Sequence, residues 1–147
     1  MTDQRELILS RIVELLSAAT GFANVVRNRG NLSETKRPYA ALFDGDEEAN
    51  ADDPDTRQTN SPRRITMRPE IFIYGQAAPE SIGSEVNIFR AKVVKALCTD
   101  ATLAALTAER TGVRYDGMTN SLSAGRTINA ELALHFIFRY YLRPDGL

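Results

Sequence analysis

The sequence predicts an α+β fold in which helices pack on one face of a mainly antiparallel β-sheet, in the order α-β-β-β-α-α-β-β. Three observations lead to this prediction. Alternation of apolar residues over 130–142 indicates a strand with one buried face. Apolar stripes at spacings of three and four over 3–19 and 81–98 indicate amphipathic helices. Extended segments separate these elements, and helices on one side of an antiparallel sheet suit that arrangement.

The first half of the chain begins with the helix over 3–19, whose apolar stripe is best explained by packing on the core. Three strand candidates follow, at 22–27, 39–43 and 65–74. The third strand contains Pro69, which lacks the N–H that a β-ladder needs. We therefore expect an edge position or a β-bulge at this residue.

The second half continues with the helix over 81–98 and a short helix over 100–108. A brief strand at 113–115 leads into a segment over 117–125 whose Gly, Asn and Ser content predicts turns. The strand over 130–142 follows.

This last strand gives the clearest signal. One face is apolar, through Ala130, Leu132, Leu134, Phe136, Phe138, Tyr140 and Leu142. The other face is mixed, through Glu131, Ala133, His135, Ile137, Arg139 and Tyr141. A helix through the same residues would be apolar nearly all round. The mixed face suits an antiparallel sheet that leaves one side free for water or a partner.

The composition predicts one domain over 1–147. The chain has 147 residues, 43% of them hydrophobic and 25% charged, with a formal net charge of −1. A dedicated duplex-DNA binder would show a basic excess, which is missing here. The single cysteine excludes an internal disulfide. We find no signal-peptide pattern and no apolar run of the ~20 residues that a membrane helix needs, so we expect a soluble protein made in the cytoplasm.

A long polar loop is predicted over 44–64. Its first part carries seven acidic residues without a basic one: Asp44, Asp46, Glu47, Glu48, Asp52, Asp53 and Asp55. Arg57, Arg63 and Arg64 follow. The loop is either a solvated insertion that is mobile in the free protein or a recognition arm that orders against a partner. Its carboxylates suit calcium or magnesium, but their spacing does not match an EF-hand, and we expect no metal site.

The sequence shows no catalytic constellation. His135 is the only histidine, and Glu131 and Arg139 share its face about 13 Å away along the strand. Cys98 ends an apolar stripe and suits a small buried residue. Phosphate-cradling glycine loops, nucleophile elbows and zinc spacings are missing from the sequence. We expect no enzyme activity and no cofactor.

Two loose basic groups could contact phosphate. One comprises Arg27, Arg29, Lys36 and Arg37, and the other comprises Arg63, Arg64 and Arg68. Without a basic surplus or interleaved aromatic residues, we interpret them as solvated loop charges, some of which balance the acidic run.

Taken together, five segments resemble a known family. They are the helix at 5–16, the segments 37–47 and 66–70, the helix at 85–97 and the segment 112–117. In this order the chain resembles the tail terminator proteins of long-tailed bacteriophages, also called tail completion or minor tail proteins. The resemblance spans nearly the whole chain and rests on arrangement, without a diagnostic motif.

The resemblance implies a virion structural protein that forms a ring, usually of six copies. Such a ring docks on the last ring of the tail tube, stops its elongation and offers a surface to the connector at the neck of the head. DNA passes through its channel without sequence-specific binding, and no membrane is involved. The expected location is the tail–neck region of the virion, after assembly in the host cytoplasm.

The candidate interface residues come from the polar loop and from the mixed face of the last strand. They are Asp44, Asp46, Glu47, Glu48, Arg57, Arg63, Arg64, Glu131, His135 and Arg139. Two alternatives remain at this point. One is a head-completion or neck connector protein, and the other is a small metal-dependent enzyme that uses the acidic cluster at 44–48.

Overall fold

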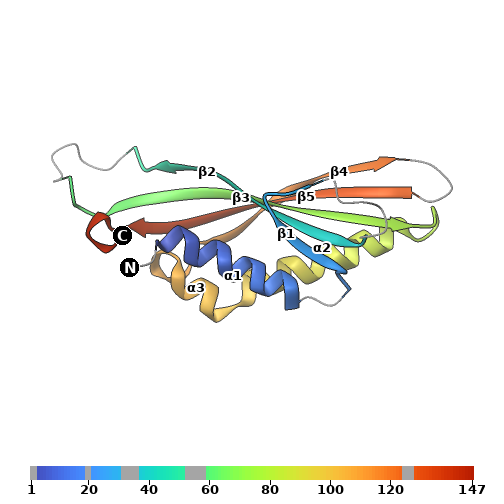
Figure 1. The fold of residues 1–147 in the computed structure, drawn as a ribbon, viewed down its shortest axis with the longest axis horizontal. Coiled ribbons are helices and arrows are strands. Elements are labelled where there is room, and N and C mark those ends of the chain that lie inside the picture. The colour runs from blue at the N-terminus through green and yellow to red at the C-terminus, as the bar shows by residue number, and fades with distance from the viewer. Residues whose placement is uncertain (1–2, 19–20, 31–36, 52–58, 124–127) are drawn as a thin grey trace.

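The computed structural model describes residues 3–18, 21–30, 37–51, 59–123 and 128–147. It shows a long, twisted five-stranded sheet with all three α-helices on one face (Figure 1). In chain order the elements are α1 (Gln4–Ala18), β1 (Asn24–Arg27), β2 (Tyr39–Ala49), β3 (Arg63–Ala77), α2 (Ile82–Thr99), α3 (Ala101–Leu106), β4 (Val113–Ser123) and β5 (Ile128–Leu142). Short 3-10 helices η2 (Ala108–Arg110) and η3 (Pro144–Gly146) complete the order. The predicted fold class and element order are confirmed.

The strands lie side by side in the order β1-β2-β3-β5-β4. Among the described strands, only β1 pairs in parallel with its neighbour, and the other three pairs are antiparallel. The sheet is therefore mainly antiparallel, as predicted, with β3 and β5 at its centre.

The core lies between the helices and one face of this sheet. The alternation predicted for the last strand is confirmed, because every even-numbered residue from Ala130 to Tyr140 is buried against it. β3 contributes its odd-numbered apolar residues in the same way. From the predicted apolar stripes, α1 buries Ile8, Ile12 and Leu16, and α2 buries Ile82, Val86, Val93 and Leu97. Leu9 of α1 is also buried, which the stripe did not predict.

The opposite face of the sheet, which we call the uncovered face, carries no helix in the part of the chain that the structure describes (Figure 1). Toward the β1 side it holds a small aromatic cluster. The rings of Tyr39 and Tyr74 stack with centroids 4.4 Å apart, and Phe43 packs edge-on against Phe72 at 5.2 Å. This end of the uncovered face is therefore apolar, whereas the other end is charged.

Pro69 lies in a central strand, so the predicted edge position is wrong, whereas the predicted bulge is confirmed. The pairing of β2 with β3 shifts between Phe43 and Asp46, where β2 contains one extra residue opposite the Pro69 region. Gly45 lies in this bulge with φ of +71°, a conformation that suits glycine. A second bulge lies in β4 between Tyr115 and Gly117.

The β2 bulge changes which side chains face the core. Without an extra residue, even-numbered positions after Leu42 would continue to point toward the helices. With it, Asp46 and Glu48 pair opposite Arg68 and Thr66 on the uncovered face, and Glu47 turns toward the helices opposite Met67.

The predicted loop over 44–64 is wrong at both ends. Residues 44–49 belong to β2 and residues 63–64 to β3, and they pair in register. The acidic composition concealed a strand whose hydrogen bonds are supplied by β3 and whose charges are neutralised by arginines. Residues 52–58 of the predicted loop lie outside the described residues, so the mobility predicted for them stays a prediction.

The turn-rich segment predicted over 117–125 is also wrong in the described part. β4 continues to Ser123, and Met118 to Ser123 pair with β5. Gly, Asn and Ser have low strand propensity, but the long partner β5 overrides it. The brief strand predicted at 113–115 is therefore only the first part of an 11-residue strand.

Gly45 provides a stability test of the bulge. A Cβ at this position would collide with the backbone oxygen of Arg68, and its positive φ disfavours any L side chain. We expect Gly45→Ala to lower the free energy of unfolding by about 2 kcal/mol or more in urea denaturation.

Gly83→Ala is the matched control, because a Cβ there meets nothing within 4 Å and the residue lies in α2. We expect this change to raise stability by up to about 1 kcal/mol. Equal effects of the two substitutions would contradict the role assigned to the bulge.

Candidate assembly surface

The four acidic residues predicted in the segment 44–48 do not converge on one point. The bulge distributes them between two environments, and arginines from other elements hold three of them. Asp44 and Glu47 contact arginines from β1 and α1, whereas Asp46 and Glu48 lie on the uncovered face.

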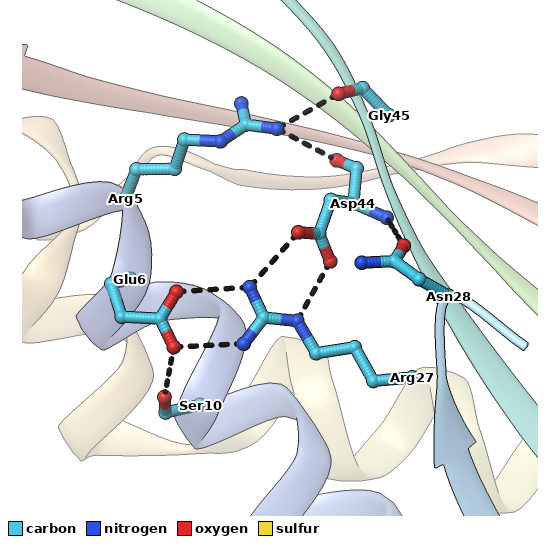
Figure 2. A network of polar contacts seen from close by, with 7 residues as sticks. All are labelled: Arg5, Glu6, Ser10, Arg27, Asn28, Asp44 and Gly45. Carbon is cyan, nitrogen blue, oxygen red and sulfur yellow. Dashed lines mark hydrogen bonds and ion pairs between the residues drawn. The ribbon is translucent and has the colours of Figure 1, made fainter.

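Arg27, at the end of β1, lies between two carboxylates (Figure 2). Its Nη1 and Nη2 donate to the two oxygens of Glu6 on α1 at 2.7 and 2.9 Å. Its Nε and Nη2 donate to the two oxygens of Asp44 on β2 at 2.8 and 2.9 Å. Planar, two-pronged contacts of this kind fix geometry as well as charge. Arg27 thus joins helix and sheet at the bulge.

Arg5 holds the same bulge from α1. Its Nη2 donates to the backbone oxygens of Asp44 and Gly45, at 3.4 and 2.8 Å (Figure 2). Its Nη1 lies 2.9 Å from Glu47 Oε2, which also accepts a 2.8 Å hydrogen bond from the hydroxyl of Tyr140 on β5. We call Arg5, Glu6, Arg27, Asp44 and Glu47 the arginine clamp.

The clamp changes the acidity of its members. The hydrogen bonds from Arg27 hold the pKa of Asp44 and of Glu6 below their ordinary values of 3.8 and 4.5. Burial, followed by the hydrogen bond to Glu47, raises the pKa of Tyr140. The carboxylates of Glu6 and Asp44 are therefore charged and committed to arginines. This arrangement favours a structural role for them over proton transfer or metal binding.

A basic groove lies on the charged end of the uncovered face. It has a volume of about 560 Å³ and is lined by four arginines and two glutamates: Arg64, Arg68, Arg114, Arg139, Glu48 and Glu109. Tyr141 and Ile137 contribute apolar surface to it. The groove crosses from β2 to β4, and its arginines exceed its carboxylates.

Two ion pairs lie in or beside this groove, and both are open to water. Arg68 lies 2.9 Å from Glu48, with 51% and 63% of the side chains exposed. Arg114 lies 3.6 Å from Asp116, with 58% and 49% exposed. Such pairs are weak and rearrange readily, so they leave the charges available to a partner.

The remaining predicted interface residues do not all lie on one face: Glu131 and His135 lie on the uncovered face, whereas Arg63 has the core-facing parity of Ile65. Glu131 lies opposite Tyr74 and Ser121 on the neighbouring strands. His135 lies between the two bulges, with Nδ1 4.0 Å from Glu70 Oε2. Arg63 and Arg64 are the first two residues of β3. Arg57 lies outside the described residues. The structure thus joins Arg64 and Arg139 in one groove with Glu48, and leaves Glu131 and His135 outside it.

Sequence reasoning missed Arg5, Glu6 and Tyr140 as partners of the acidic run. Arg27 and Arg37 were interpreted as solvated loop charges, which is wrong for both residues. Arg37 donates to the Gly75 oxygen at 3.0 Å and covers the Tyr74 ring, and Arg27 is ion-paired. That some of these arginines balance the acidic run is confirmed by the Arg27–Asp44 pair. No local sequence signal connects residues so far apart in the chain.

The described ranges contain no group of three or more His, Cys, Asp or Glu side chains placed to hold a metal ion. Among the helices in these ranges, none is both long and apolar enough to cross a membrane. Comparison with models of protein families and with curated protein sequences found no match.

The arginine clamp predicts a specific pH dependence of stability. We expect Arg27→Met to lower the free energy of unfolding near neutral pH by about 1–3 kcal/mol, because two carboxylates lose their charged donor. In the unmodified protein the unfolded chain binds protons at higher pH than the folded chain does, because the folded pKa values of Asp44 and Glu6 are lowered. Their contribution is therefore present above about pH 4.5 and is lost as the pH falls through the folded values.

Urea denaturation between about pH 6 and pH 3 measures this effect. The loss of stability on acidification should be shallower in Arg27→Met. Arg114→Met, studied in dilute solution, removes a more exposed pair as the control and should change stability by less than about 0.5 kcal/mol. An unchanged acid profile in Arg27→Met would contradict the role of the clamp.

Proposed function

We propose that this chain is a virion structural protein, a tail terminator of a long-tailed bacteriophage. It assembles into a ring, of six copies in the arrangement typical of that family. The ring caps the tail tube, stops its elongation and provides the surface that joins the tail to the connector of the head. The protein is assembled in the host cytoplasm and resides at the tail–neck region of the virion, where DNA passes through the ring without sequence readout.

The observation that carries this proposal is the open sheet with helices on only one face. Within the described residues, β4 pairs only with β5, and the part of β2 beyond Phe43 pairs only with β3. Both edges therefore offer backbone groups and charged side chains to neighbours. A subunit of a closed ring needs two such different surfaces on opposite sides.

The clamp supports a structural role over the metal-dependent enzyme that the acidic run could suggest. Asp44 and Glu47 accept hydrogen bonds from Arg27, Arg5 and Tyr140, which occupy the oxygen lone pairs that a metal would use. These acids position the β2 strand, which leaves the protein to act through surface complementarity.

Electron microscopy of tails assembled with and without the protein tests the proposal. Without it, tubes should grow to irregular lengths and fail to join heads, because nothing occupies their growing end. Adding the purified protein should restore both properties. Tails of normal length that join heads in its absence would contradict the assignment.

The control in the same experiment separates the two virion roles. The purified protein is mixed with isolated tails or with isolated heads, and bound protein is measured after sedimentation. A tail terminator should bind the tails first. Binding to heads alone would point to a head-completion or neck protein.

A further inference from the structure

Opposite edges of the sheet carry opposite charge at the same end of the molecule. On one side, β1 reaches only as far as Leu42 in its pairing with β2, so β2 forms the edge beyond the bulge. Asp46 and Glu48 lie on this stretch, exposed and directed to the uncovered face. Arg68 pairs with Glu48 at 2.9 Å, which leaves Asp46 as the surplus negative charge. We call this stretch the acidic edge.

The opposite edge is formed by the start of β4 together with the end of β5. Arg114 on β4 and Arg139 on β5 are exposed there and belong to the basic groove. Asp116 lies 3.6 Å from Arg114, which leaves Arg139 as surplus positive charge. We call this part of the groove the basic edge.

The two edges lie on one face, one to each side of the sheet. Glu48 on β2 lies opposite Thr66 on β3, and Thr66 lies opposite Arg139 on β5. Arg114 on β4 lies opposite Ile137, which is on the same face of β5 as Arg139. From β2 to β4 there are three strand spacings, or roughly 14 Å. Two acidic edges cannot attract each other, because their carboxylates repel. The acidic edge of one copy can attract the basic edge of another, and each copy then keeps its second edge for a further copy.

We propose that the acidic edge of one copy binds the basic edge of the next copy, head to tail. A contact of this heterologous kind closes into a ring when its rotation permits and otherwise extends as a filament. Closure into a ring rests on the proposed function, whereas the contact itself does not. The occupant of the basic edge is thus a second copy of this chain.

The chemistry of the groove favours a carboxylate partner over the phosphates of a nucleic acid. Glu48, Glu109 and Asp116 lie in or beside it, so its arginines leave only a small net positive charge, which a few carboxylates can match and a closely spaced row of phosphates would exceed. The acidic edge presents only two carboxylates to the uncovered face, separated by one residue, and the formal net charge of −1 allows two copies to approach.

Disulfide trapping between two variants tests the contact. Both carry Cys98→Ser, which removes the only cysteine. One also carries Asp46→Cys and the other Arg114→Cys. Mixed under mild oxidation, alone or on tail tubes, they should give a cross-linked pair on a non-reducing gel, while each variant alone should remain uncross-linked. Thr119→Cys replaces Arg114→Cys in the control, because it lies on the same strand and face beyond the β4 bulge.

Absence of the mixed cross-link both in solution and on tubes would overturn the inference, and so would an equal yield with Thr119→Cys. Cross-linking of Asp46→Cys to itself would also overturn it, because it would indicate a two-fold contact.

Charge reversal gives an independent measurement. Arg139→Asp should weaken the affinity of self-association, measured by sedimentation velocity, by about tenfold or more. Adding Asp46→Arg to the same chain should restore most of that affinity. A loss of duplex-DNA binding in Arg139→Asp with unchanged self-association would overturn the inference in favour of a phosphate site. If tails assembled without the protein have normal length and join heads, but the mixed cross-link still forms, the proposed function is refuted and this contact stands.

Discussion

One extra residue in β2 determines on which face of the sheet each acidic residue of this strand lies. Because side chains alternate along a strand, inserting one residue at Gly45 reverses the direction of every side chain that follows. Glu47 thereby turns toward the helices, where Arg5 and Tyr140 donate hydrogen bonds to its carboxylate. Asp46 and Glu48 turn to the uncovered face, where water and a partner can reach them. Without this bulge, two carboxylates would face the core and one would face solvent.

The arginine clamp makes this register stable. Past Phe43, β2 contributes little apolar surface, so burial alone would hold it weakly against β3. Arg5 binds the backbone of the bulge itself, and Arg27 ties the carboxylate of Asp44 to α1 through Glu6. These contacts join a helix, a parallel edge strand and the bulge in one network. A strand that looks like a loop by composition is thus fixed by charge.

The elements that sequence predicted well are those whose own residues carry the information. β5 alternates apolar and mixed residues over its whole length, and α1 and α2 carry apolar stripes, so each was found with bounds close to those observed. The extension of β2 and most of β4 were missed, because acidic, glycine and asparagine residues have low strand propensity. Their strand form comes from pairing with β3 and β5, which are distant in sequence.

The same limit applies to the candidate surface. Sequence located its charges, including Glu48, Arg64 and Arg139, but could not determine which face or neighbour each would have. A bulge inserts a single residue, and its position decides the direction of every later side chain in the strand. A prediction of the strand alone therefore does not say which face carries the acidic residues. Pro69 and Gly45 together could have indicated the bulge, because one removes a ladder donor and the other accepts positive φ. The acidic character of the β2 edge on the uncovered face therefore follows from the backbone at Gly45, because the bulge there sets the direction of the side chains that follow.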